Sequence, residues 1–211
     1  MPQVISVLQN GVSNVGSVCN SLHSLDLAFK VVRTASELEQ AQVIIFPGVG
    51  AFGAAMQHLT QHQLIPVLHQ KIIREKIPFL GICLGLQLLF ESSEESPHQP
   101  GLGWLKGQVK KLASDPPRHR VPNMGWCALN IEQPQNALLH ALPLASYAYF
   151  VHSYAAVPLD RHLVSLTARH GSAFVAGVCA KNIHAFQFHP EKSGPVGLAL
   201  LRAFAEWSAH V

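Results

Sequence analysis

The sequence predicts an α/β fold, with a mostly parallel central sheet flanked by helices and an added antiparallel, β-rich second half. In the first half, apolar runs alternate with amphipathic stretches, and runs such as 43–46 show no polar alternation. Such runs are typical of parallel strands that are covered on both faces. In the second half, β-rich segments follow one another at the spacing of hairpins. Because no linker or repeat interrupts the chain, we expect a single domain over 1–211.

Four strands and the helices between them account for the first half. The strands are expected at 4–8, 30–33, 43–46 and 78–83. Ser13 or Asn14 can cap the first helix, because their side-chain oxygens accept from free backbone N–H groups. The second helix is expected to open with a capping box from Ser36 to Glu39. A third helix follows the third strand, and Pro66 is expected to start a fourth.

Five β-rich segments and one helix account for the second half. The segments are 104–112, 147–157, 163–169, 174–180 and 183–188. The chain closes with an amphipathic helix over 193–210, whose apolar side carries Val196, Leu200, Leu201 and Phe204.

Cys83 lies at the junction of the fourth strand and a following helical pattern, between Gly81 and Gly85. A tight turn of the form Gly-x-nucleophile-x-Gly projects its central side chain into an open crevice. The N–H groups of the following helix favour the thiolate over the thiol. A buried structural cysteine is the alternative, since cysteine is often buried. The turn alone does not decide between the two.

His189 and Glu191 supply the partners that a cysteine nucleophile requires. Pro190 ends the last strand, so His189 stands at its tip, and Glu191 two residues later can turn back toward the imidazole. The base accepts the thiol proton, and the carboxylate orients the base. A solvated turn is the alternative. A strand-tip His-x-Glu together with a glycine-flanked cysteine favours catalysis.

The charge and cysteine content exclude several classes of function. The formal charge is +3 and the basic residues are scattered, so we expect no nucleic-acid binding. The four cysteines lack Cys-x-x-Cys spacing and read as reduced thiols of a cytoplasmic protein. No apolar run is long enough to span a membrane. No metal-ligand spacing and no phosphate-binding loop is present, so we expect neither a metal nor a cofactor.

An oxyanion formed at a carbonyl would need fixed N–H donors. The Leu84 amide is one candidate, and an amide of the loop Pro47-Gly-Val49-Gly50 is the other. An ordinary strand-to-helix turn is the alternative for that loop. Gln87, one helical turn after Cys83, could hold a polar group of the substrate or could be a solvated helix residue.

Several motifs of this chain resemble those of the class I glutamine amidotransferases, which release ammonia from glutamine. The general motifs are Gly81-Ile-Cys-Leu-Gly-Leu-Gln87 and His189-Pro-Glu191. Others resemble the amidotransferase subunits of imidazole glycerol phosphate synthase: Phe46-Pro-Gly-Val-Gly-Ala-Phe52, Leu89-Phe-Glu-Ser-Ser-Glu-Glu95, Met124-Gly-Trp126, Tyr149-Phe-Val-His-Ser-Tyr154 and Phe188-His-Pro-Glu-Lys-Ser193. The resemblance covers nearly the whole chain.

This resemblance implies a Cys83–His189–Glu191 triad that forms and hydrolyses a glutamyl thioester. It implies that glutamine is held by Gly50, Gln87 and the segment His152-Ser153-Tyr154. It further implies that ammonia passes to a (β/α)8-barrel cyclase subunit in a heterodimer, which makes imidazole glycerol phosphate in histidine biosynthesis. The residues implied to face that subunit are Asn123, Trp126, Tyr149 and Lys192.

Two segments depart from the family pattern. The family opens with Asp-Tyr-Gly-x-Gly-Asn, where this chain has Gln9-Asn-Gly-Val-Ser-Asn14, and its His-Met-Gly-Trp-Asn reads here as Asn123-Met-Gly-Trp-Cys127. A paralogue that feeds ammonia to another synthase, for instance one modifying a surface sugar, therefore stays an alternative. A stand-alone cysteine hydrolase of peptides or small amides and a catalytically idle interaction subunit are two more.

Overall fold

The structure is a computed structural model that describes residues 3–9, 11, 15–143 and 145–211. Its central feature is an eight-stranded sheet with the order β2-β1-β3-β4-β13-β12-β11-β8. The first five strands in this order are parallel, and the last three join them in antiparallel pairs. The prediction of a mostly parallel sheet with an antiparallel second half is therefore confirmed. The strands are β1 Ile5–Leu8, β2 Phe29–Val32, β3 Ile44–Gly48, β4 Phe79–Cys83, β8 Asn130–Ile131, β11 Val164–His170, β12 Ser172–Ala180 and β13 Ile183–Phe186.

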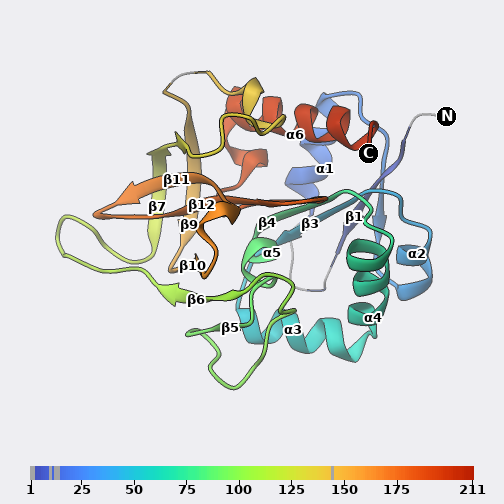
Figure 1. Ribbon diagram of the computed structural model, residues 1–211, viewed down its shortest axis with the longest axis horizontal. Coiled ribbons are helices and arrows are strands. Elements are labelled where there is room, and N and C mark those ends of the chain that lie inside the picture. The colour runs from blue at the N-terminus through green and yellow to red at the C-terminus, as the bar shows by residue number, and fades with distance from the viewer. Residues whose placement is uncertain (1–2, 10, 12–14, 144) are drawn as a thin grey trace.

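Helices cover both faces of this sheet. Figure 1 shows α1 and α6 on one face and α3, α4 and α5 on the other. Consecutive residues of β3 pack into different cores: Ile45 joins the cluster beneath α1 and α6, and Phe46 joins the cluster beneath α3 and α4. Because both faces are buried, the strand shows no polar alternation. The helices are α1 Gly16–Ser24, α2 Ala35–Glu39, α3 Phe52–Gln61, α4 Leu64–His69, α5 Leu84–Gln87 and α6 Gly194–Ser208.

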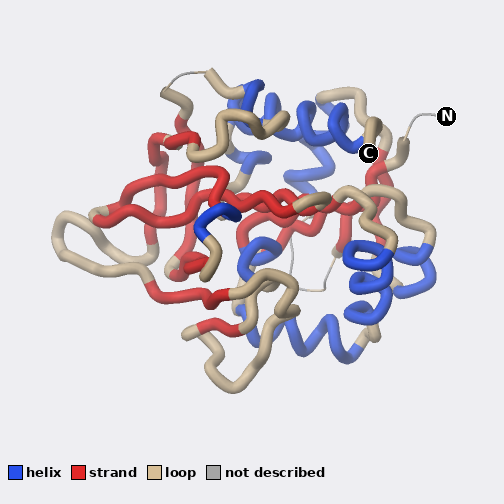
Figure 2. The backbone as a smooth tube through the Cα atoms, in the orientation of Figure 1, coloured by secondary structure: helices blue, strands red, loops and turns tan. Residues whose placement is uncertain are grey.

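Two smaller sheets stand beside the carboxyl ends of the parallel strands. One has the order β10-β6-β5, and the other is the antiparallel pair β7-β9. Figure 2 shows these strands gathered at one end of the molecule, away from most of the helices. They comprise β5 Ser92–Ser93, β6 Gly107–Lys111, β7 Asn123–Ala128, β9 Tyr147–His152 and β10 Tyr154–Pro158. In the part of the chain that the structure describes, no helix is long and apolar enough to cross a bilayer.

Several local predictions were wrong in detail. The capping box of α2 joins Thr34 and Glu37, not Ser36 and Glu39, because Thr34 is the last extended residue before the helix. The helix predicted to start at Pro66 starts two residues earlier. The predicted cap of α1, Ser13 or Asn14, lies outside the described residues.

The β-rich segments of the second half also differ from their predicted bounds. The segment 147–157 is split at Ser153 into β9 and β10, which belong to different sheets. The segment 104–112 forms a strand only from Gly107 to Lys111. Strand β7 was not predicted, since its sequence mixes Gly and Asn with apolar residues and lacks a clear period.

A close contact between α5 and β3 fixes the turn that follows β4. A Cβ added at Gly85 would lie 2.1 Å from the carbonyl oxygen of Phe46, well inside van der Waals contact. Only a residue without a side chain lets the first turn of α5 approach β3 so closely.

Gly85→Ala should therefore lower the free energy of unfolding by about 1–3 kcal/mol, because the added methyl group forces α5 and β3 apart. Urea denaturation of both proteins measures this difference. Gly194→Ala is the control: its Cβ would have no neighbour within 4 Å, so its cost comes from the positive φ alone. Identical unfolding curves for Gly85→Ala and the unsubstituted protein would contradict the steric account.

Candidate active site

Cys83 occupies a strained turn between β4 and α5. Its backbone has φ 54° and ψ −105°, a conformation that L-residues rarely adopt. At this turn the backbone changes direction sharply between the strand and the helix, and the Cys83 side chain points into a cavity. The helix expected after Cys83 is a single turn, so it contributes fewer aligned peptide dipoles than the sequence analysis assumed.

His189 and Glu191 lie directly after the neighbouring strand β13. The Nδ1 atom of His189 is 2.7 Å from Oε1 of Glu191, and their side chains are only 2% and 5% exposed. The backbone is also fixed here, because the Ser193 hydroxyl donates to the His189 carbonyl at 2.7 Å and the His189 amide donates to Tyr149. Parallel pairing of β13 with β4 brings this turn beside Cys83.

The electrostatics of His189 favour its charged form. Burial by itself lowers the pKa of the imidazole. The neighbouring Cys83 and Glu191 side chains outweigh this effect through hydrogen bonding and charge, and they raise the pKa of His189 to about 10. Nε2, the nitrogen that Glu191 does not contact, is buried, and within the described residues it has no hydrogen-bond partner other than the neighbouring Cys83 side chain. Such catalytic contacts often shorten only when substrate is bound.

A cavity of about 370 Å³ opens above Cys83 and His189. Its volume falls within the range of small-molecule sites. All seven residues predicted to form the oxyanion hole or hold the substrate line it: Val49, Gly50, Leu84, Gln87, His152, Ser153 and Tyr154. The loop after β3 and residues of α5, β9 and β10 thus meet at the carboxyl ends of the parallel strands, where open α/β sheets place their sites.

Two residues of this site were missed by the sequence analysis. Glu95 lines the cavity, and its Oε2 accepts a hydrogen bond of 2.8 Å from the Phe52 amide at the start of α3. Gln187 is fully buried, and its side-chain Nε2 lies 3.6 Å from the Cys83 sulfur. Gln187 stands within an apolar strand sequence and had no local signal, whereas Glu95 ends the quoted motif 89–95 but no role was assigned to it there.

The four residues expected to face a partner do not share one environment. Trp126 is 56% exposed, Tyr149 is half-buried beside it with ring centroids 6.0 Å apart, and Lys192 is exposed. Asn123 is buried and its side-chain nitrogen lies 3.2 Å from Nε2 of His152, so it is directed toward the cavity and not toward the exposed surface that carries Trp126. Successive residues of β7 point to opposite faces, which sends Asn123 toward the site and Trp126 toward solvent.

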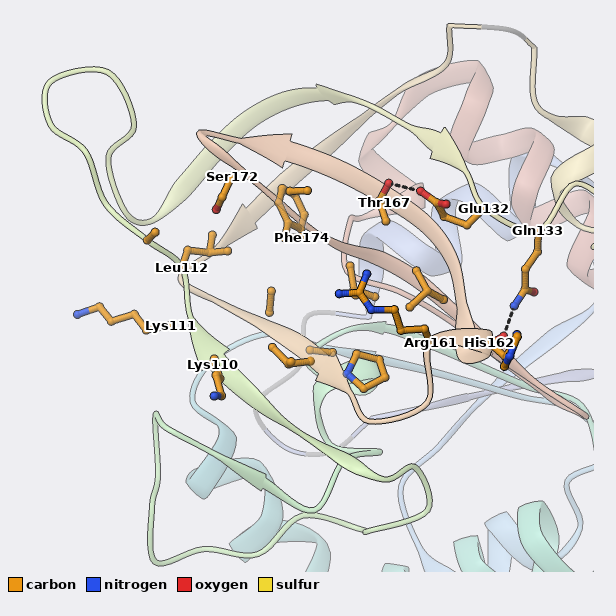
Figure 3. Close-up of a pocket in the computed structure, with 18 of the residues that line it drawn as sticks. Lys110, Lys111, Leu112, Glu132, Gln133, Arg161, His162, Thr167, Ser172 and Phe174 are labelled. Carbon is orange, nitrogen blue, oxygen red and sulfur yellow. Dashed lines mark hydrogen bonds between the residues drawn. The ribbon is translucent and has the colours of Figure 1, made fainter.

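A larger cavity of about 860 Å³ lies away from this site, between β6 and β10 on one side and β11 and β12 on the other. Figure 3 shows Arg161 reaching into it and Phe174 on its wall. None of the predicted site residues lines it. Within the described ranges, no group of three or more His, Cys, Asp or Glu side chains could hold a metal ion.

Comparison with known proteins assigns the family. The family model "Glutamine amidotransferase class-I" matches residues 6–206. A HisH subunit of imidazole glycerol phosphate synthase from Cyanothece sp. is 45% identical over 202 residues, which cover 95% of this chain and 94% of that protein. The chain belongs to the class I glutamine amidotransferases, in the HisH family. The HisH subunit from Nostoc punctiforme is 44% identical, with the same coverage of both chains.

Solved structures support the fold. A crystal structure of a glutamine amidotransferase superposes with a TM-score of 0.75 at 22% identity, covering 97% of this chain and 98% of the other. The structure of PurLQS from Thermotoga maritima gives a TM-score of 0.72 at 18% identity, covering 98% and 99%. At these identities the likeness concerns the fold alone. The segment that departs from the HisH pattern at Gln9–Asn14 lies largely outside the described residues.

Glu191→Gln should lower the pKa of His189, because the carboxylate that stabilises the imidazolium is removed. Titration of the imidazole followed by NMR measures the change. The raised pKa also stabilises the fold: this contribution is complete below pH about 6.5 and is lost as the pH rises toward about 10. The variant should therefore lose less stability than the unsubstituted protein between these pH values. An unchanged His189 titration would contradict the pairing with Glu191.

Proposed function

We propose that this chain hydrolyses glutamine at Cys83 and supplies the ammonia to a cyclase subunit that makes imidazole glycerol phosphate in histidine biosynthesis. The observation that carries this proposal is the buried His189–Glu191 pair beside the strained Cys83 turn, within one cavity. The HisH relatives match the chain almost end to end, which supports the choice of pathway.

In the first half of the reaction, the Cys83 thiolate attacks the side-chain carbonyl carbon of glutamine. A tetrahedral intermediate forms, and the imidazolium of His189 gives its proton to the leaving nitrogen, which departs as ammonia. The remaining product is a glutamyl thioester on Cys83. Glu191 keeps Nδ1 of His189 protonated and directs Nε2 toward the reacting atoms.

In the second half, water attacks the thioester carbonyl. His189, now neutral, takes a proton from that water, and the second tetrahedral intermediate expels the Cys83 thiolate and releases glutamate. The proton that left with ammonia is thus replaced from water. Cys83 and His189 end the cycle in the charge states in which they began it.

The oxyanion of both intermediates needs two N–H donors. The Leu84 amide, at the start of α5, has no helical carbonyl to bind and can supply one of them. The loop with Val49 and Gly50 can supply the other, since Gly50 has φ 94° and its turn frees backbone amides. Each donor contributes on the order of 3 kcal/mol of transition-state stabilisation.

Charged and polar groups around the cavity match the ends of free glutamine. The Glu95 carboxylate lines the cavity and can pair with the α-ammonium group of the substrate. Gln87 directs its Nε2 toward the Tyr154 carbonyl at 2.9 Å, which leaves its carbonyl oxygen as an acceptor for substrate N–H groups. The backbone from His152 to Tyr154 forms the facing wall.

The outer face of the β7–β9 pair supports a protein partner at this end of the molecule. Exposed apolar side chains gather there: Met124 is 65%, Trp126 56% and Tyr147 52% exposed. Large apolar side chains clustered on a surface mark interaction sites. We assign this face, with Tyr149 and Lys192 at its edge, to the (β/α)8-barrel cyclase subunit of a heterodimer.

The four cysteines are all free, which supports a reducing, cytoplasmic location for this reaction.

Cys83→Ala should lower glutamine-dependent synthesis by the assembled complex at least about 10³-fold, because the nucleophile is lost. Synthesis from added ammonium salts should remain, since the cyclase is untouched. Product formation with each nitrogen source provides the measurement. Cys179→Ala, which alters a free cysteine outside the cavity, is the matched control and should retain both activities. Loss of both activities in Cys83→Ala alone would mean that Cys83 has a structural role.

Trp126→Ala should weaken association with the cyclase subunit by about 10- to 100-fold, as expected for a buried aromatic anchor of an interface. The thermal stability of the isolated chain should change little, because the side chain is 56% exposed. Calorimetric titration with the cyclase measures the dissociation constant. Leu159→Ala, at an exposed apolar residue outside this face, is the control. An unchanged dissociation constant for Trp126→Ala would place the partner elsewhere.

A further inference from the structure

Gln187 is a polar side chain in contact with the Cys83 sulfur. It is fully buried, and its Nε2 lies 3.6 Å from the sulfur, within hydrogen-bonding distance for that atom. Its backbone amide donates to the Ala176 carbonyl at 2.9 Å, so the residue is held by the sheet. A buried amide requires partners for both its oxygen and its nitrogen, and here one partner is the nucleophile.

Contacts with the Tyr154 backbone carbonyl determine which end of the Gln187 amide, its oxygen or its NH₂ group, faces Cys83. The Tyr154 carbonyl can only accept, and it lies 2.9 Å from Nε2 of Gln87. The Gln87 amide must therefore present its NH₂ group on this side. The same nitrogen lies 3.1 Å from Oε1 of Gln187, so the Gln187 oxygen accepts and its NH₂ group is directed at Cys83.

The hydrogen bonds on the other side of the Tyr154 carbonyl, made by His152 and Asn123, are consistent with this orientation of the two glutamine side chains. Nδ1 of His152 also lies 2.9 Å from the Tyr154 carbonyl and must donate to it. Burial lowers the pKa of His152 to about 4, so the ring is neutral and its Nε2 is an acceptor. Asn123 satisfies that acceptor with its side-chain nitrogen at 3.2 Å. In this series of hydrogen bonds each donor therefore meets an acceptor. None of the contacts requires the Gln87 or Gln187 amide to be reversed.

We propose that Gln187 is a further catalytic residue, which stabilises the Cys83 thiolate by donating a side-chain N–H to the sulfur in a direction fixed by the Tyr154 carbonyl. This inference rests on the proposed function and adds a residue to that site. Hydrogen bonds to an ionised acceptor are stronger than those to a neutral one. The contact therefore favours the thiolate over the thiol and over the thioester.

Gln187 and His189 have separate tasks in this account. His189 exchanges a proton at each half-reaction, whereas the amide of Gln187 keeps both of its protons throughout. Because α5 is only one turn long, a donor from the residue directly after β13 supplements the few N–H groups that the helix offers to the sulfur. In the second half-reaction the same donor stabilises the thiolate as it leaves.

Gln187→Met tests the proposal, because methionine has nearly the same length and lacks the donor. Alkylation of Cys83 by iodoacetamide, located by mass spectrometry, is followed across pH in the full chain. We expect the rate at pH 6.5 to fall about tenfold and the half-maximal rate to move to higher pH. We also expect the pKa of His189 to fall from about 10 in an NMR titration, since a less ionised sulfur stabilises the imidazolium less.

Asn182→Ala is the matched control for a purely structural effect. Asn182 is an amide at the other end of the same strand, and its nitrogen donates to the Ile72 and Ile77 carbonyls without contacting the sulfur. This variant should lower the melting temperature and leave the pH profile of Cys83 alkylation unchanged. If Gln187→Met does not fold, Gln87→Met tests the same link, because it removes the donor that orients Gln187 and should shift the profile in the same direction.

A folded Gln187→Met protein whose alkylation profile superimposes on that of the unsubstituted chain would overturn the inference. The same holds for a superimposed profile of Gln87→Met where Gln187→Met does not fold. Alkylation needs neither glutamine nor the cyclase, so this result is separate from the proposed function. Failure of the unsubstituted complex to release glutamate from glutamine would instead overturn the proposed function and leave the alkylation profiles interpretable.

Discussion

The backbone turn at Cys83 is the constraint on which the site depends. A residue with φ 54° lies between a buried strand and a one-turn helix, and it is held there because Gly85 lets that helix rest against the Phe46 carbonyl. The strain is maintained by packing on both sides, as is common where function requires an unfavourable conformation. Any relaxation of this turn would move the sulfur away from both His189 and Gln187.

Parallel pairing of β4 with β13 brings the turn at Cys83 together with the residues that follow β13. The register sets Phe186 opposite Ile82, so the residues after β13 arrive beside Cys83. Three side chains from one short segment then lie around the sulfur; the roles proposed for them are donor for Gln187, proton carrier for His189 and orienting group for Glu191. A change of one residue in this register would turn the imidazole toward the opposite face of the sheet.

The β7–β9 pair has one face toward the cavity and the other face on the surface of the molecule. Its inner face carries His152, whose Nδ1 lies 2.9 Å from the Tyr154 carbonyl, and Asn123, which contacts the His152 ring. Its outer face carries Trp126 and Tyr149. A subunit bound to the outer face would contact the same two strands whose inner face lies against the cavity. The surface proposed for the partner and the wall of the cavity therefore lie on opposite faces of one pair of strands.

The sequence by itself determined the features that have a local physical cause. The division into parallel and antiparallel halves, the glycine-flanked Cys83 and the spacing of His189 and Glu191 follow from periodicity and turn chemistry that act over a few residues. The tertiary structure alone decided the break at Ser153, the inward side chain of Asn123, and the contacts of Glu95 and Gln187. These depend on pairing between segments up to about a hundred residues apart, where one position of register selects the face of a strand and no local pattern records the choice.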